Sequence, residues 1–394
     1  MKTIHLVMAV AASLVLMGTA QAGTPHDDVS CRRADVLVAL AEGQPVSYAV
    51  TGELCATRAE LYDGAAVQLL VHGATYSQEY WDFGEIDGAS YSYARAVAAR
   101  GTATFAFDQI GTGGSSHPAS ALVTVAAAAH VEHTIVRALR NGSIHGTRFG
   151  KVIAVGHALG SVVVWSEAIR YADVDGVIVT AVAHALSARY TQALPAVYYP
   201  AVSDPRFTTT GLDHGYLTTA PGARAGLFFA AFIAEEEAHK DVVPVTELIT
   251  ALPMLTSTAT RAIQVPVLTI VGGNDATTCG PGTQGGTFDC SSASAVVRQE
   301  APFYSRQARL HACVIPAAGH DLNLTLNHGL QVADAVAWSK AFVERRPGGR
   351  HDAAPSANDG LPQNCGGVSP ELSRTGSRID HQDVISRNPS RIPD

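Results

Sequence analysis

KVIAVGHALGS, residues 151–161, joins a run of apolar residues to a segment with two closely spaced glycines. The run at 151–157 predicts a buried strand, and the residues from 158 to about 171 predict a helix. A sharp turn between the two needs small neighbours, which Gly156 and Gly160 supply. Such a turn lifts one side chain above the edge of a sheet. The residue at this tip is Ala158, which carries no nucleophilic atom.

Strands and helices alternate on both sides of this turn. Further strands are predicted at 35–40, 45–50, 66–73, 102–108, 175–184, 265–275 and 308–320. Further helices are predicted at 91–101, 123–142 and 329–344. This alternation is typical of an α/β fold with a mostly parallel, doubly wound sheet, here of about eight strands. We expect its core in two parts, 23–184 and 263–345.

The alternation breaks between the two core parts. Residues 185–262 show no evident strand and carry many aromatic side chains, so we expect a helical lid there. The tail at 346–394 is rich in Pro, Gly, Ser, Asp and Arg. Because it has few apolar residues to bury, we expect disorder, except near Cys365 if that residue is disulfide-bonded.

The first 22 residues have the pattern of a cleavable signal peptide. Lys2 gives the positive start, Ile4 to Leu16 is mostly apolar, and Ala20-Gln21-Ala22 forms a cleavage site. The sequence therefore predicts export, to the periplasm or the exterior, and no membrane span in the mature chain. The net charge of −8 gives no basic surface and argues against nucleic-acid binding.

The chain has six cysteines and no C-x-x-C pair, so we expect disulfides and no metal site. Pairing neighbours in sequence gives Cys31–Cys55, Cys279–Cys290 and Cys313–Cys365. Other pairings, and free thiols, stay open. The stretch HVEH at 130–133 contains metal-binding residue types but lacks two histidines four residues apart, which favours a solvated helix face.

Three strand ends supply partners for the tip residue. Parallel strands gather their sites at their carboxyl ends, and Asp275 and His320 follow the strands that begin near 265 and 308. The strand at 66–71 ends in His72-Gly73, so the backbone N–H of Ala74 is available as an oxyanion donor. The N–H of Leu159, next to the tip, is the second donor. The chain order of positions 158, 275 and 320 is that of nucleophile, acid and base.

Together, His72-Gly73, DQIGTG at 108–113, GHALG at 156–160, Asn274-Asp275 and Gly319-His320 resemble the α/β-hydrolases of the esterase and lipase type. The resemblance covers roughly residues 45–345. It implies a serine nucleophile at position 158, where this chain has Ala158, with Asp275 as acid and His320 as base. It implies hydrolysis of a carboxylic ester or lactone of a hydrophobic small molecule, with an amide also open, and no cofactor.

Three further residues are candidates for contact with the substrate. Tyr76 and Trp81 follow the oxyanion loop, and His184 ends a strand beside the insertion. For Tyr76 and Trp81, packing in the core is an equal alternative.

The alanine at the tip has three interpretations. The chain is a form that has lost its serine and still binds substrate, or it is a natural non-catalytic binding protein on the same fold. In the third, Ser161 attacks instead. Ser161 lies about 5 Å further along the helix, which disfavours that interpretation. The retained Asp275 and His320 favour the first.

Overall fold

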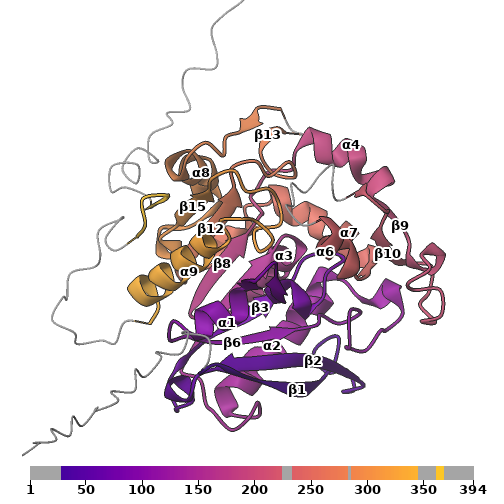
Figure 1. Ribbon diagram of the computed structural model, residues 1–394, viewed down its shortest axis with the longest axis horizontal. Coiled ribbons are helices and arrows are strands. Elements are labelled where there is room, and N and C mark those ends of the chain that lie inside the picture. The colour runs from indigo at the N-terminus through magenta and orange to yellow at the C-terminus, as the bar shows by residue number, and fades with distance from the viewer. Residues whose placement is uncertain (1–27, 224–232, 283–284, 345–360, 368–394) are drawn as a thin grey trace, which may run out of the picture.

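The computed structural model describes residues 28–223, 233–282, 285–344 and 361–367. The signal peptide predicted for 1–22, and most of the tail for which disorder is predicted, lie outside these residues. The described residues form one large sheet with helices on both faces and an inserted segment gathered at one side, on the right in Figure 1.

The central sheet has nine strands in the order β1-β2-β6-β3-β7-β8-β12-β15-β16. Their bounds are β1 (Ser30–Val38), β2 (Tyr48–Ala56), β3 (Ala66–Val71), β6 (Ala103–Phe107), β7 (Lys151–His157), β8 (Gly176–Thr180), β12 (Val267–Gly272), β15 (His311–Ile315) and β16 (Cys365–Gly367). Neighbours from β6 to β15 are parallel, whereas β1, β2 and β16 pair antiparallel. The expected doubly wound sheet is therefore present, with a ninth strand from the tail.

The two leading strands differ from their expected bounds of 35–40 and 45–50. They are longer and are separated by residues 39–47. Arg32 and Arg33 point to opposite faces of β1 and are both exposed, so the apolar pattern reveals only the second half of that strand.

Two apolar clusters pack against the faces of the sheet. Along β3, alternate side chains divide between them: Leu69 joins the cluster of α2 and α3, and Leu70 joins that of α1 and α9. The helices of the core are α1 (Tyr93–Ala98), α2 (Val125–Asn141), α3 (Leu159–Arg170), α8 (Ala293–Glu300) and α9 (Gly329–Phe342). Two small hairpins complete the core, β4 (Asp82–Ile86) with β5 (Ala89–Ser92) and β13 (Gly280–Pro281) with β14 (Thr287–Phe288).

The inserted segment is mixed rather than helical. It contains α4 (Ala188–Val197), β9 (Tyr198–Pro200), β10 (Tyr216–Thr219), α6 (Ile233–Ala238), β11 (Val243–Pro244) and α7 (Val245–Ala251). The three strands form their own antiparallel sheet. The helices were expected and the strands were not, because strands of two to four residues are too short to show an alternating pattern.

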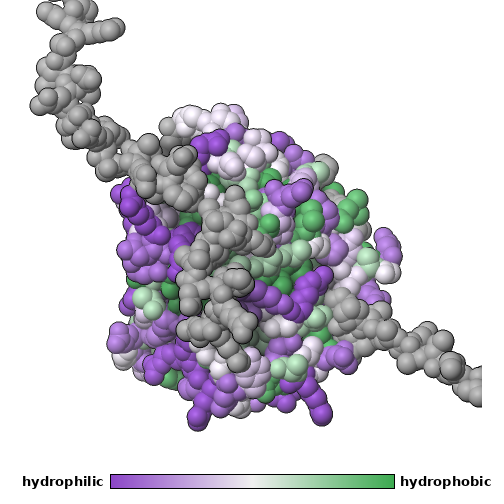
Figure 2. Space-filling view, turned by 90° about the vertical axis from the view of Figure 1, so that its left-hand side faces the viewer, coloured by the Kyte–Doolittle hydropathy of each residue, from purple (hydrophilic) through white to green (hydrophobic). Residues whose placement is uncertain are grey.

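Three disulfides occur among the described residues, with the pairing expected from closeness in sequence. Cys31–Cys55 and Cys313–Cys365 each join directly opposite residues of paired strands, and Cys279–Cys290 closes a loop after β12. None of the helices in the described ranges has the length and apolar character that crossing a membrane requires. On the face seen in Figure 2, hydrophobic residues lie among hydrophilic ones.

Candidate active site

The turn between β7 and α3 is held in an unusual backbone conformation. Ala158 has φ of 48° and ψ of −114°, a backbone conformation that residues other than glycine rarely adopt. The turn is tight: a Cβ on Gly156 would lie 2.4 Å from Cα of Ser161, and one on Gly160 would lie 2.3 Å from the carbonyl oxygen of His72. The two glycines therefore allow the strand, the turn and the loop after β3 to approach closely.

His320 and Asp275 meet at the carboxyl ends of β15 and β12. Nδ1 of His320 lies 3.1 Å from Oδ2 and 3.2 Å from Oδ1 of Asp275. Asp275 is completely buried and His320 nearly so. A buried carboxylate that faces Nδ1 fixes the ring and its tautomer, which is the task of the acid in a catalytic triad.

Thr277 is a third member of this group, and the sequence did not point to it. Its hydroxyl donates to Oδ1 of Asp275 at 2.7 Å and accepts from Nδ1 of His320 at 2.8 Å. The backbone N–H of Thr277 also donates to Asp275. The spacing Asp-x-Thr, typical of a turn in which the acid accepts from the residue two positions on, is the signal that could have revealed it.

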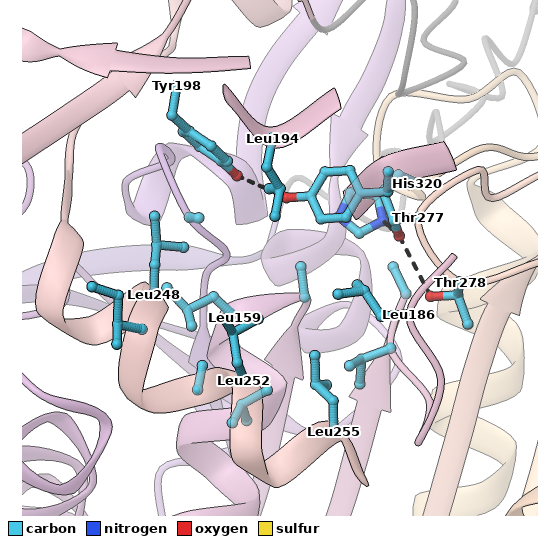
Figure 3. A pocket seen from close by; sticks show the side chains of 18 of the residues that line it. Leu159, Leu186, Leu194, Tyr198, Leu248, Leu252, Leu255, Thr277, Thr278 and His320 are labelled. Carbon is cyan, nitrogen blue, oxygen red and sulfur yellow. Dashed lines mark hydrogen bonds between the residues drawn. The ribbon is translucent and has the colours of Figure 1, made fainter. Parts of the chain in front are cut away.

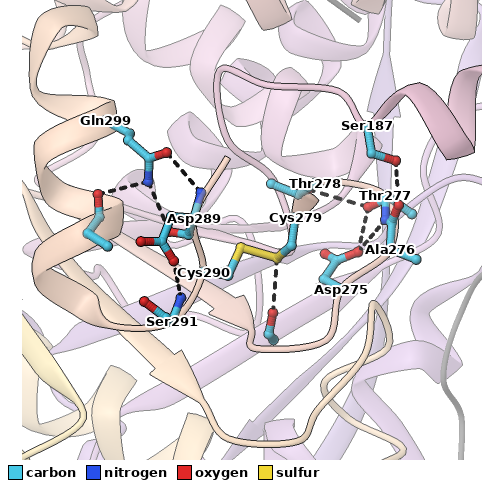
Figure 4. Close-up of a disulfide and its surroundings, with 12 residues drawn as sticks. Ser187, Asp275, Ala276, Thr277, Thr278, Cys279, Asp289, Cys290, Ser291 and Gln299 are labelled. Atoms are coloured by element: carbon cyan, nitrogen blue, oxygen red, sulfur yellow. Dashed lines mark hydrogen bonds between the residues drawn. A yellow bond between two sulfur atoms is a disulfide. The ribbon is translucent and has the colours of Figure 1, made fainter. Parts of the chain in front are cut away.

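The loop with the acid is anchored from two sides. The N–H of Ser187 donates to the carbonyl of Thr277, and the N–H of Cys279 donates to that of Asp275. Cys279 is bonded to Cys290, and Figure 4 shows this disulfide beside Asp275 and Thr277. Asp275 is thus held by the start of the inserted segment and by a covalent link.

The loop after β3 carries the first expected oxyanion donor. Ala74 and Leu159 both line the cavity beside Ala158. Within the described part of the chain, neither backbone N–H donates to a protein acceptor. A pair of uncommitted N–H groups beside the tip of the turn has the arrangement that stabilises an oxyanion.

The ring of His72 holds this loop by hydrogen bonds to backbone groups. Its Nδ1–H donates to the carbonyl of Gly73 at 2.9 Å, and its Nε2 accepts from the N–H of Gln109 at 3.0 Å. Complete burial lowers the pKa of His72 to about 4, so the ring is neutral. The DQIGTG turn is likewise structural: a Cβ on Gly113 would lie 2.3 Å from Cγ of Asp108, whose carboxylate accepts from the N–H of Gly114.

A cavity of about 400 Å³ lies between this site and the inserted segment. Figure 3 shows leucine side chains of α3, α4, α7 and the following turn pointing into it, with His320 and Thr277 on one wall. The hydroxyls of Tyr190 and Tyr198 bond one another at 3.0 Å. None of the lining residues described carries a permanent charge. A carboxylate or ammonium bound there would lose its hydration without a counter-charge, so the cavity suits an apolar molecule.

Tyr76 lines the cavity, as expected, and it also links the core to the inserted segment. Its hydroxyl donates to Glu236 of α6 at 3.0 Å and lies 3.4 Å from Asp321. Both carboxyls are completely buried. Burial and the neighbouring Glu236 raise the pKa of Asp321 well above its usual range, so the pair holds a proton at neutral pH. Asp321 is therefore engaged here, and it is Asp275 that faces His320.

Trp81 and His184 do not reach the cavity, contrary to the expectation that they contact the substrate. Trp81 is completely buried against Tyr80 and Tyr93. His184 bonds Glu300 at 2.8 Å through Nδ1, and its ring stacks on Phe303. The strand expected to end at His184 ends earlier, at Thr180, and both side chains turn into the core.

Ser161 cannot replace the missing nucleophile in this conformation. It is completely buried, and its hydroxyl donates to the carbonyl of Thr180 and accepts from the N–H of the same residue, both at 3.2 Å. The hydroxyl thus links α3 to β8 by hydrogen bonds and does not line the cavity.

The family model that describes the alpha/beta hydrolase family matches residues 68–335. Among solved structures, a soluble variant of monoglyceride lipase from Saccharomyces cerevisiae in complex with a substrate analogue is 14% identical, with a TM-score of 0.51, and covers 77% of this chain and 95% of that chain. DcsB in complex with its substrate analogue is 13% identical, with a TM-score of 0.50, and covers 78% of this chain and 97% of that chain. No curated protein matches. These solved structures share the fold of this chain. The family model matches more than half of the length of the chain, which therefore belongs to the alpha/beta hydrolase family.

Proposed function

We propose that the site binds a carboxylic ester or lactone of a hydrophobic small molecule, and that this chain is the binding-competent but inactive form of an esterase. The observation that carries the proposal is the conformation of Ala158. A left-handed backbone at a non-glycine residue costs about 1–3 kcal/mol and persists where function requires it. Here the strained backbone holds the methyl group of Ala158 in the same cavity as His320, although this methyl group has no reactive atom.

A serine at position 158 would complete an acyl-transfer mechanism. Its Oγ would attack the carbonyl carbon while Nε2 of His320 accepts the hydroxyl proton and then gives it to the leaving alkoxide. The N–H groups of Ala74 and Leu159 would hold the oxyanion. Water would release the acid by the same route. With Ala158 in place, the first bond cannot form, and substrate would stay bound and intact.

The cavity supports the substrate class. Aliphatic side chains supply most of its wall, and His320 with Thr277 and Thr278 gathers on one side. A substrate with one ester group and an uncharged hydrocarbon part would place its carbonyl at the polar side and its hydrocarbon against the leucines.

Export fits the same account. The three disulfides are typical of a protein that matures in an oxidising compartment. We therefore propose that residues 1–22 direct the chain out of the cytoplasm and are removed.

The experiment is reversion of the tip residue, Ala158→Ser, followed by assay of p-nitrophenyl esters of graded chain length and of a lactone series. The account expects activity in the reverted chain only, highest for uncharged medium-length acyl groups. If the reverted chain folds and stays inactive on the whole panel, a natural binding protein on this fold becomes the better interpretation. Activity of the unaltered chain that disappears on Ser161→Ala would contradict both.

A further inference from the structure

A second cluster of ionisable side chains lies between α2 and α3, away from the active site. It contains Glu132 and His133 of α2, Glu167 of α3 and Asp173 in the loop that follows α3. Glu167 is eight residues beyond Leu159, about 12 Å along the helix axis. None of these four residues lines the active-site cavity.

The cluster corrects the expectation that HVEH forms a solvated helix face. Glu132 is 0% exposed and His133 is partly buried. On α3, Glu167 is also 0% exposed. Helices α2 and α3 pack side by side, so these three side chains are enclosed between them.

Neither buried glutamate accepts a hydrogen bond from a donor of the described residues. The side chain of Glu167 instead contacts a second acid, the carboxyl group of Asp173. Arg140 is the nearby cation, but its guanidinium donates to Asp175 and to the carbonyl of Asp173. A buried polar group without a partner costs about 1–3 kcal/mol, and more when charged, so these carboxyls need either a proton or a bound cation.

Three ligand atoms of this cluster converge on one point. A ring nitrogen of His133, a carboxylate oxygen of Glu167 and one of Asp173 all lie within 4.8 Å of one another. Nδ1 of His133 is 2.7 Å from Oδ2 of Asp173, yet the contact does not have the direction of a hydrogen bond. Ligands around one ion, at bond lengths of about 2.0–2.4 Å, have such separations.

We propose that His133, Glu167 and Asp173 bind one divalent cation of the zinc and manganese class, which ties α2 to α3. One imidazole nitrogen with carboxylate oxygens suits Zn²⁺ or Mn²⁺. Ca²⁺ prefers six to eight oxygens, which this cluster does not supply.

One of the proposed ligands, His133, borders a groove of about 430 Å³, which His130 and Tyr171 also line. An ion can therefore approach the cluster from the side of His133. Tyr171 stacks on the ring of His133, with centroids 4.0 Å apart, and its hydroxyl bonds Nδ1 of His130 at 2.8 Å. An aromatic ring and a neighbouring histidine thus hold His133 in place, as outer groups do at metal sites.

The test is titration of the EDTA-treated full chain with ZnCl₂ by calorimetry, with MnCl₂ and CaCl₂ as separate arms. The proposal expects one saturable Zn²⁺ site, weaker binding of Ca²⁺, and a melting temperature that saturating Zn²⁺ raises by roughly 5 °C. Glu167→Gln keeps the shape of the side chain and should weaken Zn²⁺ binding at least about tenfold. His133→Gln, at a less buried position, should have the same effect if Glu167→Gln does not fold.

The matched control is His214→Ala. It removes an exposed histidine of the inserted segment that contacts none of the three proposed ligands, so it should leave the dissociation constant within about twofold. The absence of saturable binding to the unaltered chain would overturn the proposal. Equal binding by the Glu167→Gln and His133→Gln variants would also overturn it, because the bound Zn²⁺ would then sit on surface histidines.

Discussion

Nδ1 of His320 faces Asp275 at 3.1 Å, although Asp321 is adjacent to His320 in the chain. The nearer residue in sequence is bound elsewhere, at Tyr76 and, through a shared proton, at Glu236. Two buried carboxyls beside one histidine thus have different tasks. This division makes Asp321 a natural control for any test of Asp275.

In the Ala158→Ser background, Asp275→Asn should lower kcat by roughly 10³–10⁴-fold, because the amide cannot support the imidazolium or fix its tautomer. Asp321→Asn should keep most of the activity, since an amide can still donate to Glu236. The comparison is a steady-state assay of both double variants. An equal loss in the two would mean that Asp275 has no special role.

The approach of α3 to the loop after β3 should be sensitive to a single methyl group. Gly160→Ala places a Cβ 2.3 Å from the carbonyl oxygen of His72 and 2.4 Å from that of Val71, so the backbone must shift. We expect a loss of about 1–3 kcal/mol in the free energy of unfolding. Gly329→Ala at the start of α9, where a Cβ meets nothing within 4 Å, should be neutral or stabilising. Urea denaturation of both variants measures the difference, and a Gly160→Ala variant as stable as its control would show that the turn is not tight.

Ala158 itself should be a site where glycine stabilises. Glycine adopts φ of 48° without strain, and the relief of about 1–3 kcal/mol exceeds the entropy cost of about 0.4–1 kcal/mol. Ala154→Gly, in the regular part of β7, should destabilise instead. Thermal unfolding separates the two; a lower melting temperature for both variants would argue that Ala158 is unstrained.

Glu247 of α7 predicts a pH dependence of stability. Burial raises its pKa to about 8, well above the value in the unfolded chain. Between these two values the folded state holds a proton that the unfolded state has lost, so stability falls as pH rises, by up to about 1.4 kcal/mol per pH unit. Glu247→Gln removes this loss.

The advantage of Glu247→Gln should therefore be absent below about pH 4.5 and should grow up to about pH 8. Melting curves across this range measure it. The exposed Glu42→Gln serves as control, with a change within about 0.5 kcal/mol at every pH. A constant offset for Glu247→Gln would show that the carboxyl is not the cause.

Strand ends were the predictable part of this molecule. The sequence shows where an apolar run changes into a turn, and the site residues Gly156, Gly160, Asp275 and His320 lie at such boundaries. Parallel pairing of the strands brings these boundaries to one edge of the sheet. The side on which a boundary residue points is not visible in this way. His184, predicted to end a strand beside the cavity, lies beyond the end of β8 and turns towards Glu300, which is 116 residues further along the chain.

Contacts between distant segments were the unpredictable part. The pair of Glu236 and Asp321 joins the inserted segment to the core, and neither residue has a neighbour in sequence that signals the other. The cluster of Glu167 and Asp173 with His133 likewise forms only when α2 and α3 pack. Burial of such groups is decided by packing, which local periodicity does not encode.

Covalent labelling shows whether position 158 becomes nucleophilic when a side-chain oxygen is restored there. The Ala158→Ser chain is treated with an alkyl fluorophosphonate and weighed intact by mass spectrometry. The account predicts one adduct, on the peptide that contains residue 158, none on the unaltered chain, and labelling slower by several orders of magnitude when His320→Ala is added. An Ala158→Ser chain that melts as the unaltered chain does and takes no adduct, or labels equally well without His320, would contradict it.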